Sequence, residues 1–120
     1  MKWQVLLHEE FHSELEALPE AVQNELLAQA ALLEAFGPQL KRPRADALKG
    51  SKHPNMRELR FDADNGVWRL AYAFDPRRRA ILLVAGDKSG QNERRFYKRL
   101  IAKADERFEA HLARLKGKGR

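Results

Sequence analysis

Four residues in the second half of the sequence have the side-chain types that phosphodiester chemistry requires. Arg60 lies in the segment RELRF, Arg69 in VWRLAYAF, Lys88 in GDKSG and Tyr97 near the start of the last predicted helix. Guanidinium and ammonium groups stabilise the negative charge that a phosphoryl group gathers in the transition state. A tyrosine near several cations could have a lowered pKa and act as a proton carrier. We therefore predict a catalytic set of Arg60, Arg69, Lys88 and Tyr97.

A purely structural role is the alternative for each of these residues. Arginines on the exposed face of a sheet are usually just solvated. Tyr97 lies on the same helical stripe as Ile101 and Phe108, which is typical of a core residue. If Tyr97 does face a ligand, it could stack on a base instead of moving a proton. The sequence pattern leaves these alternatives open.

Further basic residues surround this set along the chain. The segment LKGSKHPNMR contributes Lys49, Lys52, His53 and Arg57, and Arg94 and Arg95 begin the last helix. Such side chains could bind the phosphates of an RNA backbone or supply a proton. We predict RNA contacts for Lys49, Lys52, Arg57, Arg94 and Arg95. A flexible, solvated loop is the alternative for the first segment.

Two other motifs suggest chemistry but lack its context. HEEFH, residues 8–12, matches the H-E-x-x-H zinc pattern, in which two histidines share one helical face. His8 directly follows a predicted strand, so the helix should start at or after it, and neither His53 nor His111 lies in a motif that supplies a third ligand. GDKSG lacks the spacing of a nucleotide-binding loop. We therefore expect no metal site and no cofactor.

Composition indicates one domain with a basic surface. The chain has 120 residues, 43% of them hydrophobic and 33% charged, and no cysteine. The net charge is +6, and it is concentrated after residue 36, since residues 1–36 carry seven acidic side chains and one lysine. A basic bias of this kind favours a polyanionic partner, although it could simply serve solubility. No segment has the length of a signal peptide core or a membrane span, so we expect a soluble, cytoplasmic protein without a membrane partner.

Hydrophobic periodicity predicts an α+β fold. The best-defined helix should place Val22, Leu26, Ala30, Leu33 and Phe36 on one stripe. The expected elements, in chain order, are a strand over 3–7, a short helix that Pro19 ends, a helix over 19–36, a basic loop over 38–55, strands over 57–61, 67–74 and 80–86, and a helix from about Asn92 to Leu115. Residues 1–115 should form the domain, and 116–120 a disordered basic tail.

The three later strands are joined by turn-forming segments, which favours an antiparallel meander. The helical hairpin should cover one face of this sheet and leave the other partly free. Arg60 and Arg69 alternate with the large apolar residues of their strands, so both should point to the uncovered face. We therefore expect two guanidinium groups on one open surface.

The strings ALKGSKHPNMRELRF and WRLAYAFDPRRRAILLVAGDKSGQNERRFYKRLIAKADERFEAHL closely resemble the HigB-like, phage-derived branch of the RelE/ParE toxin superfamily. This resemblance implies a RelE-like fold with an N-terminal strand, a helical hairpin, a three-stranded meander and a C-terminal helix. It also implies the toxin of a type II toxin–antitoxin system, an endoribonuclease that cleaves mRNA at the ribosome. Cleavage would be metal-free, by attack of a ribose 2′-hydroxyl on the adjacent phosphate. The implied partner is a helix-turn-helix antitoxin of the HigA kind.

The same resemblance implies a role for each candidate residue. Arg69 corresponds to the arginine that binds the scissile phosphate, and Arg60 to a basic residue that lines the same cleft. Lys88 would neutralise or protonate the leaving oxygen, and Tyr97 would serve as base or stacking platform. If so, the arginines of the 77–79 turn should add to RNA or ribosome binding. The alternative is a ParE-like toxin that inhibits DNA gyrase, against which the presence of all four residues argues.

Overall fold

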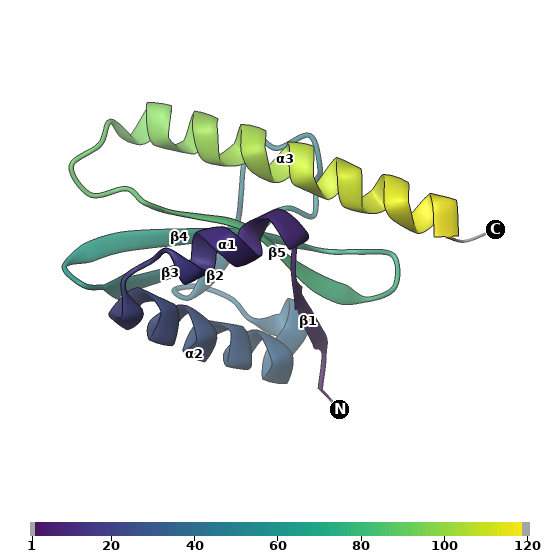
Figure 1. Cartoon of the computed structure of the whole chain (residues 1–120), viewed down its shortest axis with the longest axis horizontal. Helices are drawn as coiled ribbons and strands as arrows, with labels where there is room; N and C mark the ends of the chain where they lie inside the picture. The colour runs from purple at the N-terminus through teal and green to yellow at the C-terminus, as the bar shows by residue number, and fades with distance from the viewer. Residues whose placement is uncertain (1, 119–120) are drawn as a thin grey trace.

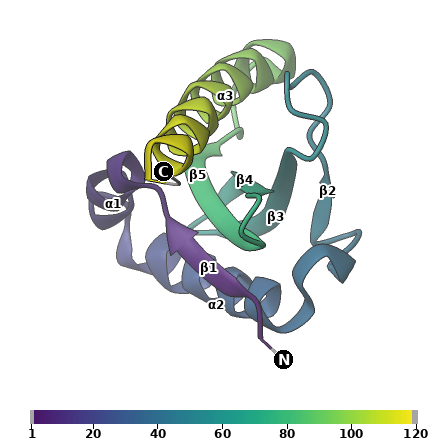
Figure 2. The ribbon, with the colours of Figure 1, turned by 90° about the vertical axis from the view of Figure 1, so that its right-hand side faces the viewer.

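The structure, a computed structural model that describes residues 2–118, is a five-stranded sheet with helices on both faces (Figures 1 and 2). Its elements are β1 (Gln4–Leu7), α1 (Glu9–Glu16), α2 (Glu20–Phe36), the 3-10 turn η1 (Gly37–Gln39), β2 (Ala45–Ala47), β3 (Arg57–Ala63), β4 (Gly66–Phe74), β5 (Arg79–Asp87) and α3 (Glu93–Lys118). The strand order is β1-β5-β4-β3-β2. All pairs are antiparallel except β1 with β5, which is parallel.

The predicted meander of β3, β4 and β5 is confirmed, and so is the α+β class. A two-residue turn joins β3 to β4, where Asp64 and Asn65 have φ of 50° and 61°. Asp and Asn tolerate this left-handed conformation better than most residues, and it matches the twist of a hairpin. The turn sets the strand register, in which Arg60 lies directly opposite Arg69.

Helices α1 and α2 cover one face of the sheet. Val22, Leu26 and Leu33 of α2 are fully buried against a core that includes Leu59 and Leu70. Phe36, predicted on the same stripe, is instead 51% exposed, because the helix ends there and Gly37 turns the chain with φ of 55°. The indole of Trp3 fills the space beside Gly37, where a Cβ atom would lie 2.4 Å from the ring nitrogen.

Helix α3 covers the second face, which was expected to be partly free (Figure 2). Its buried residues Leu100, Ala104 and Phe108 pack on small and branched side chains of β4 and β5, such as Ala73 and Leu83. The alanines leave room for the long helix to lie close to the strands. On this face α3 therefore covers β4 and β5, whereas Arg60 of β3 stays partly exposed.

The segment 38–55, predicted as a loop, contains the three-residue strand β2 at the edge of the sheet. Ala45 pairs with Leu59 and Ala47 with Arg57, so β3 imposes the extended form on a stretch too short to show periodicity. The following loop is tied to α3, because the Asp105 carboxylate accepts hydrogen bonds from the Ser51 hydroxyl and the Lys52 amide.

Helix α3 extends to Lys118, so it includes the first three residues of the predicted disordered tail, and residues 119–120 lie outside the described part of the chain. Within residues 2–118, no helix combines the length and the apolar character needed to cross a lipid bilayer.

Candidate active site

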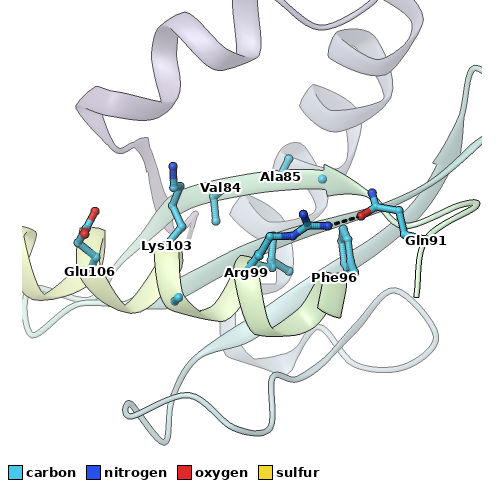
Figure 3. Close-up of a pocket in the computed structure, with 10 residues that line it drawn as sticks. Val84, Ala85, Gln91, Phe96, Arg99, Lys103 and Glu106 are labelled. Carbon is cyan, nitrogen blue, oxygen red and sulfur yellow. Dashed lines mark hydrogen bonds between the residues drawn. The ribbon is translucent and has the colours of Figure 1, made fainter. Parts of the chain in front are cut away.

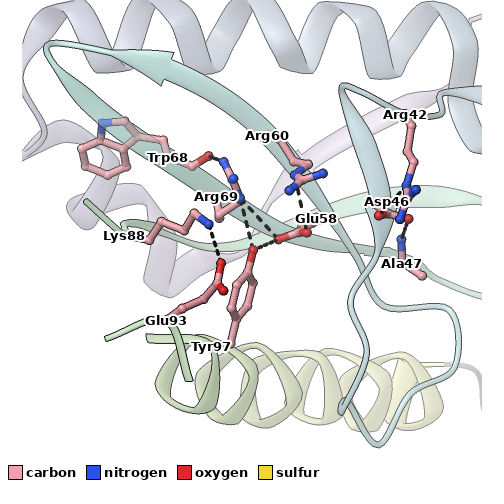
Figure 4. Close-up of polar contacts among 10 residues, drawn as sticks. All are labelled: Arg42, Asp46, Ala47, Glu58, Arg60, Trp68, Arg69, Lys88, Glu93 and Tyr97. Atoms are coloured by element: carbon pink, nitrogen blue, oxygen red, sulfur yellow. Dashed lines mark hydrogen bonds and ion pairs between the residues drawn. The ribbon is translucent and has the colours of Figure 1, made fainter. Parts of the chain in front are cut away.

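The four predicted catalytic residues converge at one end of the sheet (Figure 4). Arg60 and Arg69 face each other across β3 and β4, and Lys88 follows the end of β5. Tyr97, in the second turn of α3, reaches the same place from the helix. A fifth residue, Glu58 of β3, joins them, since it lies two positions before Arg60 and so on the same face of the strand. We call these five residues the Glu58 cluster.

Hydrogen bonds connect the centre of the cluster. The Tyr97 hydroxyl donates to Glu58 Oε1 at 2.8 Å and accepts from Arg69 Nε at 3.2 Å. Arg69 Nε also lies 3.8 Å from Glu58 Oε1, and Arg69 Nη1 donates to the backbone oxygen of Trp68 at 2.9 Å. The arginine, the phenol and the carboxylate therefore hold one another in fixed positions.

The two arginines of the cluster differ in accessibility. The Arg69 side chain is 8% exposed because it lies beneath Tyr97, so its predicted place on an open surface is wrong. The Arg60 side chain is 36% exposed. Its Nε lies 3.8 Å from Glu58 Oε2, beyond hydrogen-bond distance, and makes no hydrogen bond. Arg60 is thus the better placed of the two to bind an incoming anion.

Lys88 completes the cluster from the strand end. Its ammonium nitrogen donates to Glu93 Oε1 at 2.6 Å and lies 6.0 Å from the centre of the Tyr97 ring. The hydrogen bond from Lys88 lowers the pKa of Glu93. Glu93 is exposed in the first turn of α3, so this ion pair can open without disturbing the core.

Burial and hydrogen bonding set the proton affinities in the cluster. Burial raises the pKa of Glu58, against the opposing effects of Tyr97, Arg69 and Arg60. Burial also raises the pKa of Tyr97, and the hydrogen bond to Glu58 adds to it, whereas Arg69 acts in the opposite direction. The predicted lowering of the Tyr97 pKa is therefore wrong. The phenol is held protonated and directed at a carboxylate.

Glu58 and Glu93 were not among the predicted site residues. The sequence did hold a signal for Glu58. It lies two residues before Arg60 in the same strand, and a carboxylate on the sheet face that carries two arginines is their expected partner. Once buried, such a carboxylate needs charged or hydrogen-bonded partners, and Glu58 has Arg60, Arg69 and Tyr97. Glu93 could be found only from the position of the helix start relative to Lys88.

The predicted RNA-contact residues divide into three groups. Arg94 and Arg95 are exposed in the first turn of α3, close in sequence to Glu93, with the Arg95 amide capped by Asn92 at 3.0 Å. Lys49 and Lys52 are exposed on the loop that Asp105 ties to α3.

Arg57 forms the third group, because it points to the opposite face from the Glu58 cluster. Its Nε donates to the Tyr72 hydroxyl at 3.2 Å and its Nη2 to the Leu40 backbone oxygen at 3.1 Å. Arg57 lies two positions before Leu59 in β3, so its side chain points to the same face as Leu59, the face that α2 covers. Arg57 therefore lies apart from the Glu58 cluster.

The HEEFH segment has a structural role at the start of α1. Helix α1 begins at Glu9, as expected, and His8 is its N-cap, with Nδ1 accepting the Glu10 amide at 3.2 Å. His8 is 2% exposed, and burial lowers its pKa. Within residues 2–118 there is no group of three or more histidine or carboxylate side chains arranged to hold a metal ion.

An apolar hollow of about 510 Å³ lies between β5 and α3 (Figure 3). Val84, Phe96 and Leu100 form much of its lining, and Arg99 reaches across it to donate to Gln91 at 2.6 Å. The hollow does not combine a buried acid with cations as the Glu58 cluster does. The cluster is therefore the candidate for chemistry.

Comparisons with known proteins agree with the fold and the motifs. The phage-derived Gp49-like family matches residues 13–109, a range that contains the whole Glu58 cluster. Mycobacterium tuberculosis HigB3, named as a toxin, is 48% identical over 88 residues, which cover 73% of this chain and 75% of HigB3. HigB2 of the same organism, also named as a toxin, is 43% identical over 89 residues, or 73% of this chain. This chain covers 44% of the length of HigB2.

Two solved structures share the architecture at low sequence identity. A mutant of the Escherichia coli toxin RelE in the free state has a TM-score of 0.61 with 15% identity, covering 86% of this chain and 97% of that one. The archaeal RelE–RelB complex from Pyrococcus horikoshii gives a TM-score of 0.53 with 21% identity, covering 75% and 99%. These two show a RelE-like fold. The family match and the HigB relatives establish that the chain belongs to the phage-derived Gp49-like family and is HigB-like.

Proposed function

We propose that this chain is the toxin of a type II toxin–antitoxin system and that it cleaves mRNA at the ribosome without a metal ion. The observation that carries the proposal is the Glu58 cluster, in which three cations surround a phenol that is hydrogen-bonded to a buried carboxylate. The names of the HigB relatives support the toxin assignment.

In the proposed reaction a ribose 2′-oxygen attacks the adjacent phosphorus, and the bond from phosphorus to the 5′-oxygen of the next nucleotide breaks. Arg60 and the edge of Arg69 stabilise the negative charge on the non-bridging oxygens. Lys88 gives a proton to the departing 5′-oxygen. The products are a 2′,3′-cyclic phosphate and a free 5′-hydroxyl.

The proton of the attacking hydroxyl needs an acceptor. Tyr97 stays protonated near neutral pH because its pKa is raised, so it cannot act first as a phenolate base. Its hydroxyl can accept the 2′ proton only while passing its own proton to Glu58, which lies 2.8 Å away. Glu58 is then the final proton acceptor, and Tyr97 is the residue that contacts the substrate.

The ion pair between Lys88 and Glu93 has to open in this scheme. A phosphate that approaches Lys88 competes with the exposed Glu93 carboxylate for the same ammonium group. Because Glu93 is on the helix surface, its release exposes no apolar residue. Glu93 therefore lowers the affinity of the empty site for anions, including anions that are not substrates.

Primer extension on translated mRNA tests the activity. The chain should produce discrete cleavage sites, and Arg60→Ala should reduce cleavage about 100-fold, the effect of losing one transition-state donor. Lys103→Ala, which removes an exposed cation from α3, is the matched control and should cleave normally. Addition of a chelator should leave cleavage unchanged. Supercoiling by DNA gyrase is measured with the same preparation, and inhibition of gyrase without RNA cleavage would replace this proposal by the ParE-like alternative.

We also propose that an antitoxin restrains the chain in the cytoplasm. The solved complex of archaeal RelE with RelB supports an antitoxin as partner, and we propose a helix-turn-helix protein of the HigA kind. Expression of the chain alone should arrest growth, and co-expression with the adjacent reading frame should restore it. Normal growth on expression of the chain alone, with the folded protein present, would contradict the toxin assignment.

A further inference from the structure

A second cationic surface lies at the far end of the sheet from the Glu58 cluster. Its centre is Trp3, whose ring lies 4.9 Å from the guanidinium carbon of Arg78. Lys2 and Arg77 are exposed beside this pair and line the same hollow. We call Lys2, Trp3, Arg77 and Arg78 the Trp3 platform.

The platform is separate from the proposed active site. Strand β5 runs from Arg79, beside the platform, to Asp87, beside Lys88, a distance of about 26 Å at the usual rise of an extended strand. The Trp3 ring packs edge-on against Phe74, with centroids 5.4 Å apart, and Phe74 packs against the core under α1 and α2. The Glu58 cluster lies on the other face, under α3.

The surface beside the indole of the platform is hollowed. Two hollows of about 390 and 410 Å³ are lined by Trp3, the first together with Arg57 and the second with Lys2 and Arg77. Gly37 supports the ring from below, because any larger residue there would occupy its position. Trp3 is therefore held in one orientation although it is only half-buried.

The charges of the platform are available to a ligand. Within residues 2–118, Lys2, Arg77 and Arg78 form no ion pair, whereas Arg79 is bound to the buried Asp75 at 2.9 Å. Arg78 has φ of 64°, a left-handed conformation in which glycine or asparagine carries less strain. An arginine at this position of the turn costs stability, which is consistent with a use for its side chain.

We propose that the Trp3 platform binds a single-stranded RNA segment outside the scissile linkage, with one base stacked on Arg78 and Trp3 and the flanking phosphates on Lys2 and Arg77. Aromatic rings combined with cations are the usual means of holding single strands without sequence preference. The planar guanidinium of Arg78 offers a base a flat surface for stacking. A carboxylate would instead bind the N–H groups along the edge of the guanidinium. The inference rests on the proposed function only in taking RNA as the ligand.

Tryptophan fluorescence tests this directly, because the chain has two tryptophans and Trp68→Phe leaves Trp3 as the only one. The ligand is a single-stranded 2′-O-methyl RNA, which lacks the attacking hydroxyl and cannot be cleaved by the proposed reaction. Its binding is followed by anisotropy of a label on the RNA and by quenching of Trp3. We expect both signals to change together.

Arg78→Gly is the informative variant, since glycine suits the left-handed turn and should not weaken the fold. It should weaken binding about tenfold, the loss expected for one base stack. The slope of log affinity against log salt should change little, because Lys2 and Arg77, and not Arg78, neutralise the phosphates. Arg78→Lys should keep that slope and still bind more weakly, because the charge remains and the planar stack is lost. Lys103→Ala controls for a general loss of positive charge.

Four results would overturn the inference. Three concern RNA: no binding at all, binding without quenching of Trp3, or unchanged affinity in Arg78→Gly. The fourth is quenching of Trp3 by polyglutamate but not by RNA, which would indicate an acidic protein as the partner. The proposed function fails separately. Quenching and binding without cleavage of translated mRNA would contradict the nuclease and keep the platform, and cleavage of translated mRNA without quenching would do the reverse.

Discussion

The Tyr97 hydroxyl donates a hydrogen bond of 2.8 Å to the Glu58 carboxylate, and so joins α3 to β3 across 39 residues of sequence. The same hydroxyl accepts from Arg69, which brings β4 into the contact. A carboxylate buried in this way keeps its partners in place, because each of them would leave Glu58 less well compensated if it moved. This contact therefore controls both the geometry and the proton affinities of the proposed site.

Tyr97→Phe should separate the contribution of the Tyr97 hydroxyl from that of its ring, because it removes only the hydroxyl. The ring keeps its edge-on contact with Phe96, while Glu58 and Arg69 each lose a partner, so we expect a stability loss of about 1–2 kcal/mol and a fall in cleavage of about 100-fold. Denaturant unfolding and primer extension measure the two effects. Tyr72→Phe is the matched control, because the buried Tyr72 hydroxyl accepts from Arg57 on the other face. A similar loss of cleavage in both variants would argue against a role in the chemistry.

Glu58→Gln should change the pH dependence of stability. The pKa of Glu58 is raised in the folded state, so its contribution to stability is fully present below the unfolded pKa and is lost as the pH rises through the folded pKa. The glutamine variant does not ionise. We therefore expect the variant to lose less stability than the parent when the pH rises from about 4.5 through that window, as measured by urea unfolding. Parallel stability curves would show that Glu58 does not ionise with a raised pKa.

The two arginines of the cluster should respond differently to removal. Arg60→Ala should cost less than about 0.5 kcal/mol of stability, because the side chain is one third exposed and makes no hydrogen bond through Nε, yet cleavage should fall sharply. Arg69→Ala should lose cleavage and also about 3 kcal/mol, because Arg69 is buried against the Glu58 carboxylate and donates hydrogen bonds to the Tyr97 hydroxyl and the Trp68 backbone oxygen. Thermal unfolding and cleavage assays on both variants check this. Equal stability losses would contradict the difference in burial.

Glu93→Gln should increase the affinity for RNA. The variant releases Lys88 from its ion pair, so the ammonium group becomes available to a phosphate, and we expect binding several-fold tighter at low salt. Binding of 2′-O-methyl RNA measures the change. Glu106→Gln, at an exposed position of the same helix, has the same effect on net charge and serves as the control. If both variants tighten binding equally, the effect is one of net charge and not of Lys88.

Asp75→Asn should destabilise the turn that carries Arg77 and Arg78, the two arginines of the Trp3 platform. Burial alone would raise the pKa of Asp75, but hydrogen bonds from His111 and Arg79 outweigh it and lower the pKa. The resulting stability is present above the unfolded pKa, about 3.8, and is lost as the pH falls through the folded pKa. We expect the variant to lose about 1–3 kcal/mol near neutral pH and less in acid, as measured by denaturant unfolding. A loss that is constant with pH would contradict the assignment.

The local patterns of the chain were sufficient for most of the elements and for the pairing of the site arginines. Alternation in RELRF and VWRLAYAF placed Arg60 and Arg69 on one face, and the short turn between the strands made them neighbours, as the register shows. The stripe of the second helix was correct up to Leu33 but not at Phe36, where the helix ends. The strand β2 was missed, because its extended form depends on pairing with β3.

Periodicity and turn chemistry act over a few residues, and so the sequence alone was enough to indicate the strands, the helical hairpin, the meander and the shared face of two arginines. It could not show that α3 lies over that face, that Glu58 becomes buried between Arg69 and Tyr97, or that Glu93 takes up the charge of Lys88. Those features depend on contacts between segments distant in sequence. Burial and proton affinity follow from such contacts, because both depend on which atoms displace water from a side chain.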